Sequence, residues 1–222
     1  MWTKICGATG DADIGLLAEL GVDLIGLWHG VPGGHADLTS AQLTRLAGLT
    51  TARGATPVLV TFVRDATTLR TVTSASGTRW VQLHGYQPPA LVAALKAEGL
   101  TVVKVLHLRG EDCVERPLIA SYERAGTDLF LLDSVTADGQ VGSTGVPPAP
   151  DAARALAQRL TRPFLLAGGI QPDIRDRYAE LTALPGFAGI DVDSFARGQD
   201  GAFSAERVTA LRQAWGAKGG TS

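Results

Sequence analysis

The strings Lys4-Ile5-Cys6-Gly7 and Leu131-Leu132-Asp133-Ser134 each end an apolar run with one side chain that can transfer a proton. The first string supplies a thiol and the second a carboxyl group, although they lie far apart in the chain. The tips of two such distant strands face each other across one mouth when the sheet closes into a barrel. The pairing therefore favours a closed barrel and acid–base chemistry on a small molecule.

Short β-branched segments alternate with longer segments of helical periodicity along the chain. The eight expected strands are Thr3–Cys6, Leu24–Trp28, Pro57–Phe62, Trp80–Leu83, Val102–Leu106, Leu129–Asp133, Phe164–Ala167 and Gly189–Val192. Apolar residues spaced by about 3.6 positions predict helices between them. These helices include Ala12–Leu20, Ser40–Ala47, Pro88–Ala97 and Ala149–Arg159. Strands that alternate with helices predict right-handed βαβ units and a parallel sheet.

Eight such units in 222 residues predict an α/β fold, a single-domain (β/α)₈ TIM barrel. The alternative is a doubly wound open sheet. Against it, no Gly-x-Gly-x-x-Gly turn follows the first expected strand, and the glycines gather late in the chain. We expect the barrel to occupy residues 1–216 and residues 217–222 to form a frayed tail.

The composition, with 45% hydrophobic and 19% charged residues, is that of an ordinary globular protein. A net charge of -2 argues against nucleic acid or an anionic membrane as a partner. No apolar stretch reaches the roughly 18 residues that span a bilayer, and no signal-peptide pattern opens the chain, so we expect a cytoplasmic protein. The two cysteines, Cys6 and Cys113, resemble neither a disulfide framework nor a zinc site, and we expect no metal.

The working residues of a (β/α)₈ barrel lie at the carboxyl ends of the strands and in the loops that follow. This rule places Cys6, Gln82, His84, Asp133 and Asp191 at the mouth. A buried cysteine is often only a small core residue, and an aspartate after a strand often only caps a helix. The co-occurrence of both at strand ends favours catalysis over those structural roles.

Glycine-rich segments follow the sixth and seventh expected strands, at Gly142–Gly145 and Gly168-Gly169. Barrels commonly bind phosphate near the last strands through backbone N–H groups and a helix N-terminus. Pro172 suits the first turn of such a helix. The glycines can also serve tight packing alone, and we favour phosphate contact.

Six strings together resemble the phosphoribosylanthranilate isomerase family, whose members catalyse an Amadori rearrangement in tryptophan biosynthesis. In the family's order and spacing, the strings are Lys4–Gly7, Gln82–Gly85, Leu131–Ser134, Gly142–Gly145, Leu166–Gly169 and Gly189–Val192. They cover nearly the whole chain. The resemblance implies a small sugar-phosphate substrate and no cofactor, and it leaves both a monomer and a homodimer open.

By matching position, the resemblance implies that Asp133 is the general acid that opens a furanose ring and that Cys6 is the general base that removes the C2 proton. Each proton transfer typically lowers a barrier by about 3 to 5 kcal/mol. The residues expected to bind the substrate are His35, Arg64, Gln82, His84, Gly145, Gly168, Gly169, Asp191 and Ser194.

The sequence departs from the family pattern around the substrate. The second βα loop, residues 28–37, lacks the arginine that pairs with the anthranilate carboxylate in the family, which leaves His35, His29 or Arg64 to replace it. Such a contact contributes on the order of 1.5 to 3 kcal/mol. A relative that acts on a different aminosugar would show this pattern.

The presumed phosphate loops also depart from the family pattern. The eighth loop carries Asp193-Ser194-Phe195, where the family has a serine–glycine step, and Asp173 adds a second carboxylate nearby. The Asp193 carboxylate would repel a phosphate unless Arg197 offsets its charge.

Three functions therefore remain open. The first is an Amadori isomerase acting on a phosphoribosyl amine. The second is a diverged barrel enzyme, such as a lyase, that uses Asp133 and Cys6 on another substrate. The third is a non-catalytic barrel that binds a ligand. We expect Cys113, in a polar segment away from any strand tip, to be structural, whereas His107 follows the fifth strand and can line the mouth.

Overall fold

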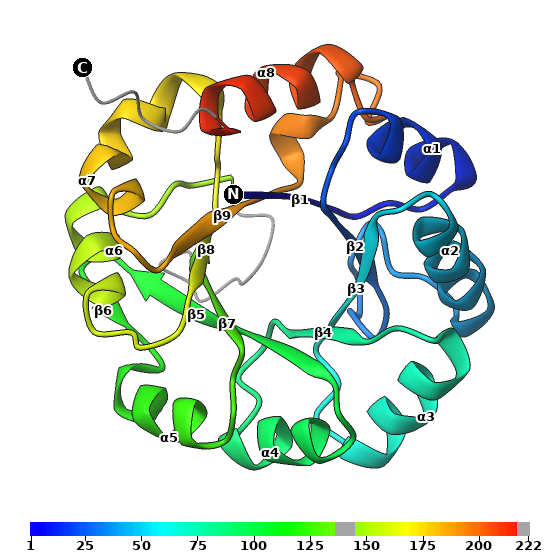
Figure 1. Ribbon diagram of the computed structural model, residues 1–222, viewed down its shortest axis with the longest axis horizontal. Helices are drawn as coiled ribbons and strands as arrows, with labels where there is room; N and C mark the ends of the chain where they lie inside the picture. The colour runs from blue at the N-terminus through cyan, green and yellow to red at the C-terminus, as the bar shows by residue number, and fades with distance from the viewer. Residues whose placement is uncertain (136–144, 217–222) are drawn as a thin grey trace.

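The structure, a computed structural model, describes residues 1–135 and 145–216, which form a ring of strands surrounded by helices (Figure 1). The strands are β1 (Trp2–Cys6), β2 (Leu24–Trp28), β3 (Thr56–Thr61), β4 (Trp80–Leu83), β5 (Thr101–Arg109), β6 (Asp112–Cys113), β7 (Leu129–Ser134), β8 (Phe164–Leu166) and β9 (Phe187–Val192). The α-helices are α1 (Asp11–Glu19), α2 (Ser40–Ala52), α3 (Ala66–Ser76), α4 (Pro89–Ala97), α5 (Ile119–Arg124), α6 (Pro150–Ala157), α7 (Ala179–Thr182) and α8 (Ala205–Gly216). Three short 3₁₀ helices are η1 (Arg116–Leu118), η2 (Pro172–Tyr178) and η3 (Ser194–Ala196).

The strands close into a barrel. Their order is β4-β3-β2-β1-β9-β8-β7-β5, and β4 also pairs with β5 to complete the ring. All pairings around the ring are parallel. The predicted (β/α)₈ barrel is thus confirmed, and all eight expected strands are present. The predicted tail, residues 217–222, and the glycine-rich residues 142–144 lie outside the part of the chain that the structure describes.

The fifth strand is longer than predicted, and this changes the expected positions of His107 and Cys113. A turn at Gly110, where φ is +58°, folds the chain back, so that β6 pairs antiparallel with the end of β5. His107 therefore lies within β5 rather than after it. The expectation that Cys113 lies in a polar segment away from any strand tip is wrong, because Cys113 is buried and pairs with Leu108 at the end of β5.

Capping residues mark the helix ends. Thr39 and Gln42 form a reciprocal capping box at the start of α2, which runs five residues beyond its predicted end. Asp65 accepts a 2.7 Å hydrogen bond from the Thr68 backbone at the start of α3. That helix ends at Gly77 in the left-handed conformation, where an L side chain would be strained.

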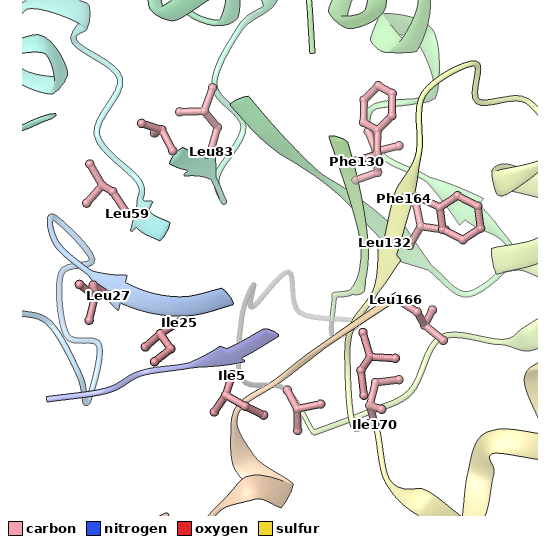
Figure 2. Packing of buried hydrophobic residues seen from close by; sticks show 14 of the residues in the cluster. Ile5, Ile25, Leu27, Leu59, Leu83, Phe130, Leu132, Phe164, Leu166 and Ile170 are labelled. Carbon is pink, nitrogen blue, oxygen red and sulfur yellow. The ribbon is translucent and has the colours of Figure 1, made fainter. Parts of the chain in front are cut away.

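The hydrophobic core has two layers, because successive side chains of a strand point to opposite faces of the sheet. The outer layer packs between the strands and the helices, as Ile25, Leu27, Leu59 and Leu132 illustrate (Figure 2). The inner layer fills the barrel beneath its mouth with the side chains of Leu24, Val58, Val103, Val105, Leu129, Leu131, Leu165 and Ala167. Apolar packing therefore closes the lower part of the barrel, and the cavity lies above it at the carboxyl ends of the strands. Among the described residues, no helix is long and apolar enough to cross a membrane.

Candidate active site

A cavity of about 520 Å³ lies at the carboxyl ends of the barrel strands. Residues from β1, β2, β3, β7 and β9 line it, together with residues that follow β2, β3, β4, β7, β8 and β9. The predicted site residues that line it are Cys6, His35, His84, Asp133, Gly145, Gly168, Gly169, Asp191 and Ser194. Cys6 and Asp133, from strands far apart in sequence, thus border one shared space.

Cys6 belongs to a buried cluster with Lys4 and Asp191. The Lys4 Nζ atom donates to Cys6 Sγ at 2.6 Å and to Asp191 Oδ2 at 2.8 Å. The Cys6 sulfur lies 3.6 Å from the same carboxylate oxygen. Strand geometry explains the cluster, because Lys4 is paired with Asp191 in the β1–β9 register and lies two residues before Cys6 on the same face of β1.

The electrostatics of this cluster favour a protonated thiol in the unliganded protein. Burial and the Asp191 carboxylate raise the pKa of the Cys6 thiol, while the Lys4 ammonium acts in the opposite direction. Burial lowers the pKa of Lys4, but Asp191 and Cys6 together raise it above its ordinary value. Lys4 is therefore an ammonium, and additional positive charge in the cavity would favour the thiolate of Cys6.

A glycine on the neighbouring strand makes room for the thiol. Gly26, on β2, is paired with Cys6 in the β1–β2 register. A Cβ atom on Gly26 would overlap the Cys6 sulfur and lie 3.2 Å from Lys4 Nζ. Any larger residue at this position would displace the proposed base or its cation.

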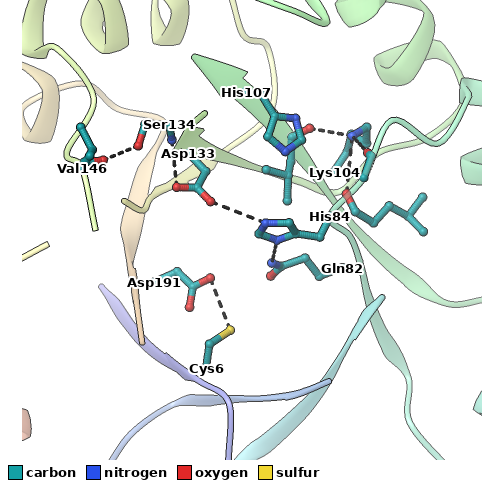
Figure 3. A network of polar contacts seen from close by, with 12 residues as sticks. Cys6, Gln82, His84, Lys104, His107, Asp133, Ser134, Val146 and Asp191 are labelled. Atoms are coloured by element: carbon teal, nitrogen blue, oxygen red, sulfur yellow. Dashed lines mark hydrogen bonds and ion pairs between the residues drawn. The ribbon is translucent and has the colours of Figure 1, made fainter. Parts of the chain in front are cut away.

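Asp133 and His84 form a second polar group, which faces Cys6 and Asp191 across the cavity (Figure 3). The Asp133 Oδ2 atom lies 3.6 Å from His84 Nε2, and Oδ1 accepts a 2.9 Å hydrogen bond from the Ser134 backbone. Burial raises the pKa of Asp133 to about 6, and the Asp191 carboxylate adds to this effect. Asp133 can therefore hold a proton at mildly acidic pH and donate it to a bound molecule.

The imidazole of His84 is neutral, since burial and the charges of His107, Lys4 and Lys104 hold its pKa well below 6.5. The Gln82 Nε2 atom lies 3.0 Å from His84 Nδ1. The sequence predicted that Gln82 binds the substrate, but Gln82 is fully buried and is not among the residues that line the cavity. Its contact is with His84, on the side away from the cavity.

Arg64 and His35 were both predicted to bind the substrate, but only His35 borders the cavity. Arg64 is exposed between β3 and α3 and is not part of the wall, because the chain turns outward after Phe62. The His35 side chain is 52% exposed, and its Nε2 atom lies 3.4 Å from Asp193 Oδ2. Its ring contacts the Trp28 ring, with centroids 4.8 Å apart.

Arg197 balances the negative charge of Asp193, as the sequence analysis considered. The Arg197 Nε atom donates to Asp193 Oδ1 at 2.9 Å, and Nη2 donates to the Gly7 carbonyl at 2.7 Å. The pair ties the loop after β9 to the loop after β1. A phosphate near Ser194 would therefore meet an ion pair and not an uncompensated carboxylate.

The glycines after β8 allow close approach of backbone. Gly168 and Gly169 have φ angles of +81° and +53°. A Cβ atom on Gly169 would overlap the Gly145 carbonyl oxygen, and one on Gly168 would lie 2.8 Å from the Val146 oxygen. Packing alone thus requires both glycines. Pro172 begins the following helix as predicted, although η2 is a 3₁₀ helix.

Sequence reasoning gave no role to several residues of the site. Lys4 lies two residues before Cys6 and received no role, although lysine occurs at only four positions in the chain. The structure shows that Lys4 is fully buried beside Cys6. Trp28 and Phe62 line the cavity at the ends of two expected strands, so the rule that selected Cys6 also applied to them. Gly26 carried no local signal, because its role depends on strand register.

A metal centre finds no support in the described part of the chain, residues 1–135 and 145–216. No group of three or more His, Cys, Asp or Glu side chains is placed there to hold a metal ion.

Known proteins resemble this chain over nearly its whole length. The family model described as N-(5'phosphoribosyl)anthranilate (PRA) isomerase matches residues 3–214. The N-(5'-phosphoribosyl)anthranilate isomerase of Paramagnetospirillum magneticum is 30% identical over 219 residues, which cover 98% of this chain and 97% of that protein. The enzyme of the same name from Symbiobacterium thermophilum is 31% identical over 212 residues, covering 87% and 89%.

The fold is shared with solved structures as well. The phosphoribosyl anthranilate isomerase from Thermus thermophilus superposes with a TM-score of 0.77 at 26% identity, covering 95% of this chain and 96% of that chain. The residues that the family model matches, 3–214, include both polar groups of the cavity. The chain therefore belongs to the N-(5'-phosphoribosyl)anthranilate isomerase family.

Proposed function

We propose that this protein isomerises N-(5'-phosphoribosyl)anthranilate in tryptophan biosynthesis, with Asp133 as the general acid and Cys6 as the general base. The observation that carries the proposal is that the side chains of Asp133, on β7, and Cys6, on β1, border the same cavity. Each belongs to a separate cluster of polar residues. A sugar bound between them would present its ring oxygen to one and its C2 hydrogen to the other.

In the first step, Asp133 gives its proton to the furanose ring oxygen. The bond between that oxygen and C1 breaks, and the lone pair of the amine nitrogen forms a C=N bond to C1. The raised pKa of Asp133, about 6, supports this role because an efficient acid has a pKa near the working pH. The neutral His84 imidazole, 3.6 Å away, leaves the proton on Asp133.

In the second step, Cys6 takes the proton from C2 as a thiolate. The C–H electron pair forms a C1=C2 bond, and the positive charge on the nitrogen is neutralised. That positive charge favours the thiolate beforehand, as does Lys4 at 2.6 Å, and Asp191 is the adjacent acceptor for the thiol proton. The enolamine then regains a proton at C1 from Cys6 and loses its O2 proton to Asp133, while Asp191 returns the thiol proton, which restores the enzyme.

We place the phosphate and the anthranilate ring at different parts of the cavity. Gly168, Gly169 and Ser194 line one cavity, where their backbone N–H groups would bind the phosphate, and the Asp193 charge next to Ser194 is balanced by Arg197. Trp28 and Phe62 supply aromatic surface for the ring of the amine.

The test is turnover of phosphoribosylanthranilate, followed by the loss of its fluorescence. We expect the natural sequence to be active, and C6A and D133N each to lower kcat at least about 100-fold. C113A and D176N are matched controls, because Cys113 is buried outside the cavity and Asp176 is exposed. An inactive parent protein, or full activity in C6A or D133N, would refute the proposal.

A second candidate is a related barrel enzyme, such as a lyase, that acts on a different small substrate. It is favoured by one observation: no arginine or lysine is among the described residues that line the cavity, so an anthranilate carboxylate would meet only His35 at the rim. Binding of another sugar phosphate without turnover of phosphoribosylanthranilate would support this candidate. If C6A altered neither activity nor ligand affinity, the barrel would be non-catalytic.

A further inference from the structure

A buried histidine–glutamate pair lies beside Asp133 and has no part in the steps above. The His107 Nδ1 atom lies 2.6 Å from Glu115 Oε1, and the His107 backbone N–H donates to Glu115 Oε2 at 2.8 Å. The side chains are 0% and 3% exposed. Glu115 reaches His107 because the turn after β5 brings β6 and the residues after it back over the strand.

His107 is the neighbour of Asp133 in the barrel wall. The two residues are paired in the parallel register of β5 and β7, so their side chains point to the same side of the sheet. Paired residues on adjacent strands lie about 5 Å apart at the backbone. The His107 ring also stands edge-on to the His84 ring, with centroids 5.9 Å apart, and Figure 3 shows His107, His84 and Asp133 grouped on one side of the cavity.

The second nitrogen of His107 has no assigned partner. Among the described residues, nothing forms a hydrogen bond with the buried Nε2 atom. Glu115 contacts the ring through Oε1 and the His107 backbone N–H through Oε2, and it leaves the Nε2 atom available. A residue needed only for packing would not require a buried carboxylate 2.6 Å from one nitrogen and an unpaired second nitrogen near the proposed acid.

The other charged and titratable groups around the pair are contributed by several elements. Glu115 is an anion: burial raises its pKa, but His107 and Lys104 together lower it below the ordinary value. The Lys104 Nζ atom lies 3.9 Å from Glu115, and burial lowers the Lys104 pKa to about 8. Tyr86 packs on His107 with centroids 5.0 Å apart, and Cys113 lies 4.0 Å from Glu115.

Asp133 itself faces His84 from the loop after β4, Asp191 from β9 and Lys4 from β1. Burial raises the pKa of Asp133, and the largest opposing effect comes from His107. A positive charge at the position of His107 would therefore lower the pKa of Asp133.

We propose that His107, held by Glu115, is a positioning residue that sets the pH range in which Asp133 keeps its proton. Burial raises the pKa of Asp133, and the pair would limit this rise, so that the carboxyl group can still lose its proton in the buried site. This inference rests on the proposed role of Asp133, but the titration of Asp133 can be measured whether or not the protein turns over phosphoribosylanthranilate.

The experiment is a ¹³C NMR titration of the aspartate carboxyl groups, with the Asp133 signal assigned by its absence in D133N. In H107Q we expect the Asp133 midpoint to rise by about half a pH unit or more, because a positive charge several ångströms away is removed. H107N is a second variant, in case H107Q does not fold. C113A is the control for loosening of β6 and should leave the midpoint unchanged.

The sign of the shift in E115Q shows whether Glu115 acts through His107. If Glu115 acts by keeping His107 charged, E115Q raises the Asp133 midpoint. If it acts only by its own charge, removal of an anion lowers the midpoint. The double variant H107Q/E115Q measures that direct effect alone.

The proposal is overturned if H107Q and H107N both leave the midpoint where it is, or if E115Q lowers it equally with and without His107. Turnover of phosphoribosylanthranilate, measured alongside the NMR titration, then separates the two proposals. A shifted NMR titration in a protein without turnover supports the pairing and refutes the isomerase function, whereas an active protein with an unshifted midpoint does the reverse.

Discussion

The ammonium of Lys4 lies 2.6 Å from the sulfur of Cys6 in a site where neither side chain is appreciably exposed. The same nitrogen contacts Asp191 at 2.8 Å, so one cation stabilises both a carboxylate and, once it forms, a thiolate. A buried cation so close to the proposed base explains how a thiol in an apolar setting can lose its proton at all.

Lys4 is therefore expected to be needed for the reactivity of Cys6. In K4M the thiol loses its neighbouring cation, and its alkylation by iodoacetamide should slow by at least about tenfold at pH 8, since one pKa unit is a factor of ten. The measurement is made in a C113A background so that only Cys6 reacts. K96M, at a lysine on the barrel exterior, is the control. Equal alkylation rates in K4M and its parent would contradict the proposed role of Lys4.

Removal of Lys4 should also destabilise the fold. K4M leaves the Asp191 carboxylate buried without its cation, which typically costs about 3 to 5 kcal/mol. The double variant K4M/D191N has no uncompensated charge, and its free energy of unfolding in urea should exceed that of K4M. If the second change gave no recovery, the Lys4–Asp191 pair would not be the source of the loss.

Asp133 is expected to make stability depend on pH. Its folded-state pKa of about 6 lies above the unfolded value of about 3.9, so its contribution is present below pH 4 and is lost as the pH rises through 6. D133N has no charge to bury, and at pH 8 it should be more stable than the parent by about 3 kcal/mol, with little difference at pH 4. Urea unfolding at both pH values is the measurement, with D176N as the exposed control. A constant difference at both pH values would show that Asp133 is not the titrating group.

Gly26 is expected to matter for activity through its missing side chain. In G26A the new methyl group would overlap the Cys6 sulfur and displace it, so kcat should fall at least about tenfold. G48A is the control, because Gly48 lies in α2 and a Cβ there meets no atom within 4 Å. That variant should keep full activity with equal or greater thermal stability. Full activity in G26A would show that the thiol position is not critical.

Arg197 is expected to permit phosphate binding next to Asp193. R197Q removes the partner at 2.9 Å and leaves an additional negative charge on the cavity wall, so KM for the phosphorylated substrate should rise about tenfold. The double variant R197Q/D193N should recover most of that affinity, and R177Q serves as the exposed control. If R197Q raised KM no more than R177Q does, the phosphate would lie elsewhere.

The sequence by itself determined the barrel and the end of it at which the cavity lies. Eight alternations of strand and helix leave few topologies, and the residue at the end of a strand must lie at the mouth of a parallel barrel. Cys6, Asp133 and Asp191 were found in this way, because their placement depends only on where each strand ends and on the alternation of side chains between the two faces of a strand.

Only the tertiary structure decided which side chains meet. Lys4 and Asp191 are 187 residues apart and are joined by the register of β1 and β9, and Gly26 acquires its role from the same kind of pairing. The position of Glu115 depends on a turn that extends β5, and the outward course of the chain after β3 takes Arg64 away from the cavity. Periodicity along one strand specifies the direction of a side chain, but contacts across strands depend on register and loop path, which are set by packing of the whole barrel.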